Sequence, residues 1–71
     1  MNKITAEVTV VHCMNRYLRD IRRECPYGHY QKMKAEVLEA AREVVDECSH
    51  RVLEKLIEEM ETEEMEAEEN A

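Results

Sequence analysis

The sequence predicts a mainly α-helical fold, in which an antiparallel helical hairpin has a long second helix. Apolar residues recur at steps of three and four over most of residues 12–60, which is the spacing of one helical face. The 71 residues hold one proline and one glycine, at positions 26 and 28, so a single turn is expected. A chain of this length makes at most one domain, which we place at residues 1–60, followed by an acidic tail over residues 61–71 that is either ordered or disordered.

The first helix is expected over residues 12–25. Its apolar face is made of residues about one turn apart, namely Val11, Met14, Leu18, Ile21 and Cys25. Pro26 disfavours helical geometry in the residue before it, so the helix is expected to end at Cys25. Residues 26–28 then form the turn, in which the proline presets φ and Gly28 can take a positive φ.

Residues 4–11 are compatible with a helix and with a strand. Ile4, Val8 and Val11 continue the helical face, but six of the eight residues are β-branched and apolar residues alternate with polar ones. As a strand, the segment would give the order β-α-α, which resembles the ribbon-helix-helix family of DNA-binding dimers. The resemblance lies in element order alone, and it implies a regulator or antitoxin whose strands read DNA and whose acidic tail binds a partner.

The second helix is expected over residues 30–60, because no proline or glycine interrupts its pattern. Such a helix is about 46 Å long, against about 21 Å for residues 12–25. Its apolar overhang then needs a cover, which a second chain supplies most simply in a two-fold homodimer. We therefore expect a homo-oligomer that associates through Val, Leu, Ile and Met side chains.

Charge is divided unevenly along the chain, whose formal net charge is −7. Residues 14–34 carry six positive and two negative groups, whereas residues 35–71 carry three positive and fourteen negative ones. The basic segment also holds all three tyrosines. Residues 58–69 are mostly Glu, which predicts either a solvated, fraying helix end or a tail that docks on a basic partner.

The turn and its flanks form the candidate ligand-binding site. Arginine offers paired donors that match phosphate and carboxylate, tyrosine rings stack on bases, and the start of the second helix presents free N–H groups. These properties favour a protein or a small phosphate-bearing ligand, such as a nucleotide, over DNA. The candidate residues are Arg16, Tyr17, Arg19, Arg23, Tyr27, His29, Tyr30, Lys32 and Lys34.

No catalytic residue, metal ligand or cofactor is assigned from the sequence. In a hairpin, Cys13 and Cys48 are offset by about 9 Å and Cys25 lies at the far tip, so one chain cannot close a four-ligand zinc site. Two ligands from each of two chains remain an alternative. The cysteines are otherwise expected as small core or seam residues, and no oxyanion-hole or glycine-rich signature for catalysis occurs.

These observations together predict a small non-enzymatic binding protein in the cytoplasm. The odd number of cysteines, three, argues against a disulfide framework. Neither an apolar run of about 18 residues nor the zones of a signal peptide are found, so no membrane attachment is expected. Size and acidity resemble those of small phage-encoded inhibitors, which titrate a host protein or sequester a nucleotide. That similarity is one of size and charge, with no shared motif.

Overall fold

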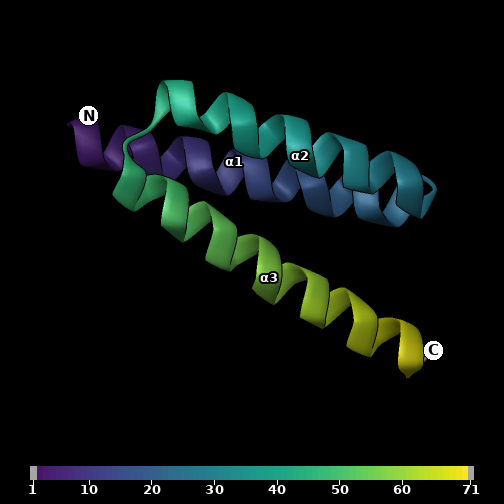
Figure 1. Ribbon diagram of the computed structural model, residues 1–71. Helices are drawn as coiled ribbons and strands as arrows, with labels where there is room; N and C mark the ends of the chain where they lie inside the picture. The colour runs from purple at the N-terminus through teal and green to yellow at the C-terminus, as the bar shows by residue number, and fades with distance from the viewer. Residues whose placement is uncertain (1, 71) are drawn as a thin grey trace.

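The chain folds into three helices packed against one another. The computed structural model describes residues 2–70 and contains α1 (Lys3–Glu24), α2 (Tyr27–Val44) and α3 (Glu47–Glu69). Helices α1 and α2 lie side by side and antiparallel, and α3 returns beside α1 in the direction of α1, crossing the pair at an angle (Figure 1). The molecule measures 41 × 21 × 17 Å. The expected helical class is confirmed.

The single long helix predicted over residues 30–60 is wrong, because the chain breaks at Val45 and Asp46. Val45 is extended, with φ −128° and ψ 159°, and its side chain turns into the core. The Asp46 carboxylate accepts a hydrogen bond from the Ser49 N–H at 2.9 Å and so caps the start of α3. The apolar residues after the break therefore pack within the same chain, which removes the uncovered overhang from which an oligomer was predicted.

The strand alternative for residues 4–11 is also wrong, since these residues belong to α1. Asn2 caps the helix by accepting from the Thr5 N–H at 2.8 Å. Val11 is fully buried against the other helices, and this packing outweighs the β preference of its neighbours. A ribbon-helix-helix dimer needs a strand, and residues 2–70 contain none.

The reversal between α1 and α2 is tighter than predicted. Only Cys25 and Pro26 separate the two helices, and the Pro26 carbonyl accepts from the N–H groups of His29 and Tyr30. Gly28 lies inside the first turn of α2 and has no positive φ, so the expected glycine turn is wrong. Proline suits a position at a helix start, where its missing N–H leaves no hydrogen bond unmade.

The core runs along the inner sides of all three helices. Its largest member is Tyr30, whose ring is fully buried and whose hydroxyl donates to the Glu61 carboxylate at 2.7 Å. That hydrogen bond offsets the cost of removing the phenol from water. The buried apolar residues are Val11, Leu18, Tyr30, Ala41, Val45, Leu53, Ile57 and Met60.

Buried polar groups hold the end of the molecule where α1 and α3 begin, which we name the capped end. Glu7, 8% exposed, accepts from the Asp46 N–H at 2.9 Å and from the Ser49 hydroxyl at 3.1 Å. His50, 5% exposed, contacts the Leu38 carbonyl oxygen through Nε2 at 2.8 Å and a carboxylate oxygen of α3 through Nδ1. The His50 ring thus bridges the Leu38 carbonyl of α2 and a carboxylate of α3. One glutamate and one histidine thus tie all three helices together.

Candidate functional site

Ion pairs between α1 or α2 and the last turns of α3 hold the opposite end of the molecule, which we name the charged end. Arg19 pairs with Glu63 at 3.2 Å, and Arg23 pairs with Glu64 at 2.8 Å. The remaining pairs are Arg22 with Glu68 at 2.8 Å and Lys34 with Glu61 at 2.9 Å. Four cations of the basic segment are therefore paired with glutamates of the acidic segment within the chain.

The pKa values at the charged end follow from these contacts. A hydrogen bond to Glu68 raises the pKa of Arg22, and one to Glu64 raises the pKa of Arg23. The hydrogen bond from Arg23 holds the pKa of Glu64 below its usual value of 4.5. Burial, followed by the hydrogen bond to a carboxylate, raises the pKa of Tyr30, so its hydroxyl stays protonated and donating. Each group is thus held in its charged or donating form.

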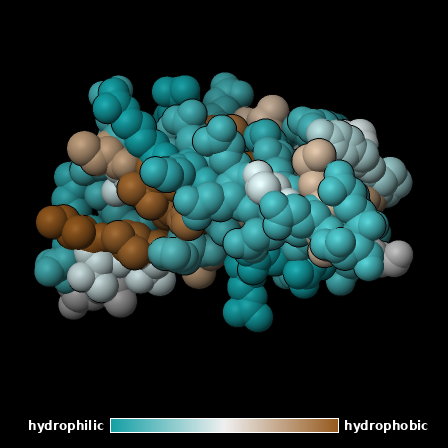
Figure 2. All heavy atoms as spheres, turned by 90° about the horizontal axis from the view of Figure 1, so that it is seen from below, coloured by the Kyte–Doolittle hydropathy of each residue, from teal (hydrophilic) through white to brown (hydrophobic). Residues whose placement is uncertain are grey.

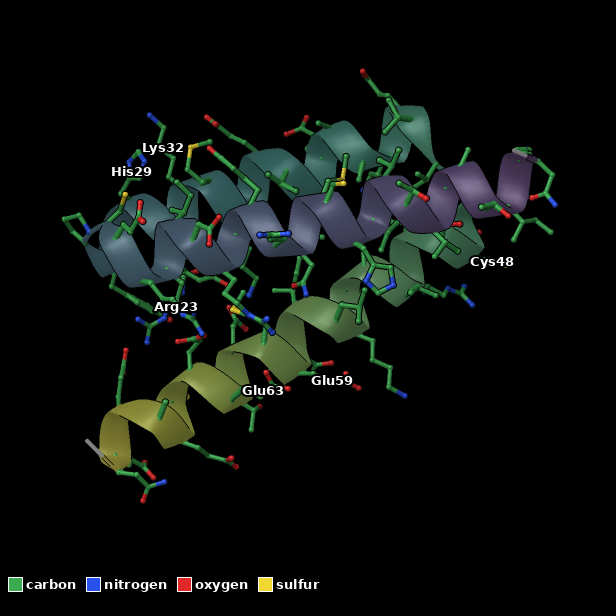
Figure 3. All side chains as sticks on the ribbon, turned by 180° about the vertical axis from the view of Figure 1, so that it is seen from behind. Arg23, His29, Lys32, Cys48, Glu59 and Glu63 are labelled. Carbon is green, nitrogen blue, oxygen red and sulfur yellow. The ribbon has the colours of Figure 1, made fainter. Side chains whose placement is uncertain are left out.

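The structure separates the nine candidate residues instead of gathering them at one tip. Arg23 extends from α1 towards α3, whereas His29 and Lys32 project from α2 on the side away from α3 (Figure 3). Tyr30 lies in the core, out of reach of a ligand. Tyr27 is exposed but sits beneath the Arg22 guanidinium, at 5.3 Å from the ring centroid. Tyr27 shares a pocket with Arg22, Glu61 and Glu68, whereas Arg16, Arg19 and Arg23 line a different groove that contains no tyrosine.

One subset of the candidates does come together, along one side of α1. Arg16, Arg19 and Arg23 line a shallow groove that His12 extends by one further turn. These four residues follow one another at steps of four, three and four, so they share a helix side, and we name them the cationic stripe. The only acid in the groove is Asp20, and Asn15 completes its lining. Sequence reasoning missed His12, although its spacing from Arg16 was a usable signal.

Arg16 differs from the other arginines of the stripe. Its side chain is exposed and forms no ion pair within the described residues, whereas Arg19 and Arg23 both do. Lys32 on α2 is likewise exposed and makes no ion pair there. Arg16 is thus the member of the stripe with its full set of donors open to a partner.

The cysteines lie far from the positions expected for core residues. Cys13 and Cys48 are exposed and Cys25 is half-buried, so the expectation that they are core residues is wrong, and a place at a seam with another chain stays a prediction. Figure 3 shows Cys48 near the start of α3, at the opposite end from His29. Within the part of the chain that the structure describes, no three Cys, His, Asp or Glu side chains are grouped as a metal site would need.

Comparison with protein-family models, with curated proteins and with solved structures found no match to this chain. Among residues 2–70, no helix has both the length and the apolar composition that a bilayer crossing needs. The cationic stripe places three guanidinium groups and an imidazole on one side of one helix, which is an arrangement suited to binding acidic groups.

Proposed function

We propose that the protein is a small non-enzymatic binding protein whose cationic stripe takes an acidic partner. The observation that carries the proposal is the groove on α1, where three arginines and a histidine stand beside a single carboxylate. Guanidinium groups pair with carboxylates through two parallel hydrogen bonds and favour such partners strongly. Arg19 and Arg23 already hold the carboxylates of Glu63 and Glu64, which come from a helix of the same chain.

The side chains of the cationic stripe are better suited to bind the carboxylates of a protein than to bind a nucleotide. Recognition of a base would call for an exposed ring next to the cations. Tyr30 is buried, and Tyr27 is covered on one face by Arg22. Tyr17 is exposed, but it follows Arg16 directly and so points about 100° away from it around the helix. The stripe therefore offers charge and forked donors without a stacking surface.

The pairs that already occupy Arg19 and Arg23 can be exchanged. The Arg19–Glu63 pair is open to solvent, at 37% and 66% of the side-chain surface, whereas Arg23, at 59%, pairs with Glu64, which is only 12% exposed. Ion pairs of this kind contribute about 1 kcal/mol or less, and salt screens them. An incoming acidic helix can displace the Arg19–Glu63 pair at little cost, and it gains the free donors of Arg16 and the exposed part of the Arg23 guanidinium.

Binding of a labelled poly-glutamate peptide, followed by fluorescence anisotropy, tests this function. We expect Arg16→Ala with Arg23→Ala to weaken binding by about tenfold or more, because two guanidinium donors are lost. The matched control, Lys32→Ala with Arg42→Ala, removes the same charge from exposed positions outside the stripe and should change the affinity by less than about threefold. Equal effects of the two double variants would contradict the proposal. Stronger competition by inorganic tripolyphosphate than by unlabelled peptide would point to a phosphate-bearing partner instead.

A further inference from the structure

We infer that the acidic partner of the cationic stripe is α3 of a second copy of this chain. In this arrangement two copies place their α1–α3 faces together about a two-fold axis that runs along the helices. The inference rests on the proposed function, because it uses the same stripe and names its partner. It draws on charge and apolar matching across the α1–α3 face, and not on the overhanging helix that the sequence had suggested.

A row of glutamates on α3 supplies the complementary surface. Glu59, Glu63 and Glu66 follow at steps of four and three, so they share one side of α3, and we name them the acidic stripe. All three are exposed, and Glu59 and Glu66 make no ion pair within residues 2–70. Figure 3 shows Glu59 and Glu63 one turn apart on α3. Val52 lies two turns before Glu59 on the same side.

The two stripes lie at the same level along the molecule. Helices α1 and α3 run in the same direction, and residues that hydrogen-bond across their seam are 39, 41, 42 and 44 positions apart in the chain. Arg16 and Glu59 are 43 positions apart, Arg23 and Glu66 also 43, and Arg19 and Glu63 44. Each arginine of the stripe is therefore level with one glutamate of the acidic stripe.

A two-fold axis parallel to the helices places the arginines of one copy opposite the glutamates at the same height in the other copy. It places α1 of one copy over α3 of the other, running in the same direction and in the same register. Arg16 of one copy then meets Glu59 of the other, and Arg23 meets Glu66. Because the contact is self-complementary, every pair forms twice. The same rotation leaves the capped ends together and the charged ends together.

Apolar residues match at the capped end of the same face. Val8 and Val52 are 44 positions apart, hence level with each other, and they are 43% and 48% exposed. Ile4, one turn before Val8, is 73% exposed. Figure 2, which views the molecule from the α3 side, shows the most strongly hydrophobic residues gathered at the end where α1 and α3 begin and mainly hydrophilic residues over the rest of the face. A second copy in the proposed register covers this apolar patch with its own.

One pair of residues across the proposed interface, His12 and Lys55, is not complementary in charge, so a substitution there should increase the affinity of the dimer. His12 lies 43 positions before Lys55, so these two groups face each other between copies. A carboxylate at position 55 would face the histidine instead of an ammonium group. Lys55→Glu should therefore tighten the dimer by about threefold to tenfold.

Charge reversal of one residue on each stripe tests the inference directly. Arg16→Glu and Glu59→Arg each place like charges opposite one another twice in a homodimer. Each variant alone should weaken dimerisation by about 100-fold, because like charges across an interface are strongly disfavoured. An equimolar mixture should recover a heterodimer close to the wild-type affinity, since the introduced carboxylate faces the introduced guanidinium and the other contact is unchanged. Native mass spectrometry separates the two variants and their heterodimer by mass.

Matched controls separate this contact from a general effect of charge. Glu58→Arg and Arg42→Glu make the same charge changes at exposed positions off both stripes, and they should leave the dimer intact. A wild-type monomer, or variants that stay dimeric or fail to recover on mixing, would overturn the inference. If poly-glutamate still binds the monomer through Arg16 and Arg23, the proposed function stands without a second copy. If the peptide also fails to bind, the proposed function falls with the inference.

Discussion

The capped end and the charged end use the same residue type, glutamate, in two different ways. At the capped end Glu7 is nearly buried, and it accepts hydrogen bonds from a backbone N–H and a hydroxyl of the α2–α3 connection. At the charged end Glu63 and Glu68 are exposed and pair with arginine side chains. The first arrangement is largely shielded from solvent by the burial of Glu7, whereas water and ions compete directly with the exposed carboxylates of the second.

This difference assigns the two ends different tasks. A buried carboxylate that satisfies a helix start holds the chain in one arrangement, because removing it leaves polar groups without partners. Exposed ion pairs contribute little and exchange readily. The capped end thus fixes how α3 leaves the α2–α3 connection, and the charged end keeps its cations available to an outside carboxylate.

Replacing one glutamate at each end by alanine should lower the free energy of unfolding more at the capped end than at the charged end. Glu7→Ala leaves the Asp46 N–H and the Ser49 hydroxyl without their acceptor, so we expect the free energy of unfolding to fall by about 1–3 kcal/mol. Glu63→Ala removes one exposed ion pair and should cost less than about 1 kcal/mol. Urea unfolding followed by circular dichroism measures both. A cost at Glu63 equal to that at Glu7 would contradict the division.

As the pH falls, the Glu64 ion pair at the charged end should be lost before the Asp46 cap at the capped end. The pKa of Glu64 is held below its usual 4.5 by the hydrogen bond from Arg23, and the pKa of Asp46 is held below its usual 3.8 chiefly by the Ser49 backbone hydrogen bond. A lowered folded-state pKa contributes stability above the usual pKa and loses it as the pH falls through the folded value. The contribution of Glu64 to holding α3 against α1 should therefore be lost below about pH 4.5, while the Asp46 cap at the start of α3 persists to lower pH. NMR chemical shifts across the titration distinguish this order from its reverse.

Local patterns predicted the helical class, but they did not predict the path of the chain. Val11 and Leu18 fall on one helical face, and that spacing predicted the part of α1 from residue 12 onward, while residues 4–11 remained compatible with a strand. The break at Val45 lacks proline and glycine, so the periodic pattern runs through it unchanged. Asp46, three residues before Ser49, was the available signal, since Asp is a strong N-cap.

The candidate site was predictable only in part, because its partners are remote in sequence. The spacing of Arg16, Arg19 and Arg23 shows that they share a helix side. That Arg19 and Arg23 meet acids 44 and 41 positions later depends on the return of α3, which the predicted long helix did not allow. Tyr30 looked like a ring for a ligand, yet its step of three to Met33 and seven to Val37 also marks a core position.

Hydrogen exchange of the α3 amides at low and high salt tests the central claim most directly, namely that ion pairs contribute most of what holds the last turns of α3, whereas buried hydrogen bonds hold its start. Salt at about 0.5 M shortens the screening length to roughly 4–5 Å and supplies ions that compete for the charged groups, so it weakens solvent-accessible ion pairs and leaves buried hydrogen bonds intact. Protection of residues 61–69 should then drop by several-fold while that of residues 49–57 stays unchanged. An equal loss of protection along the whole helix, or a loss confined to residues 49–57, would contradict the account.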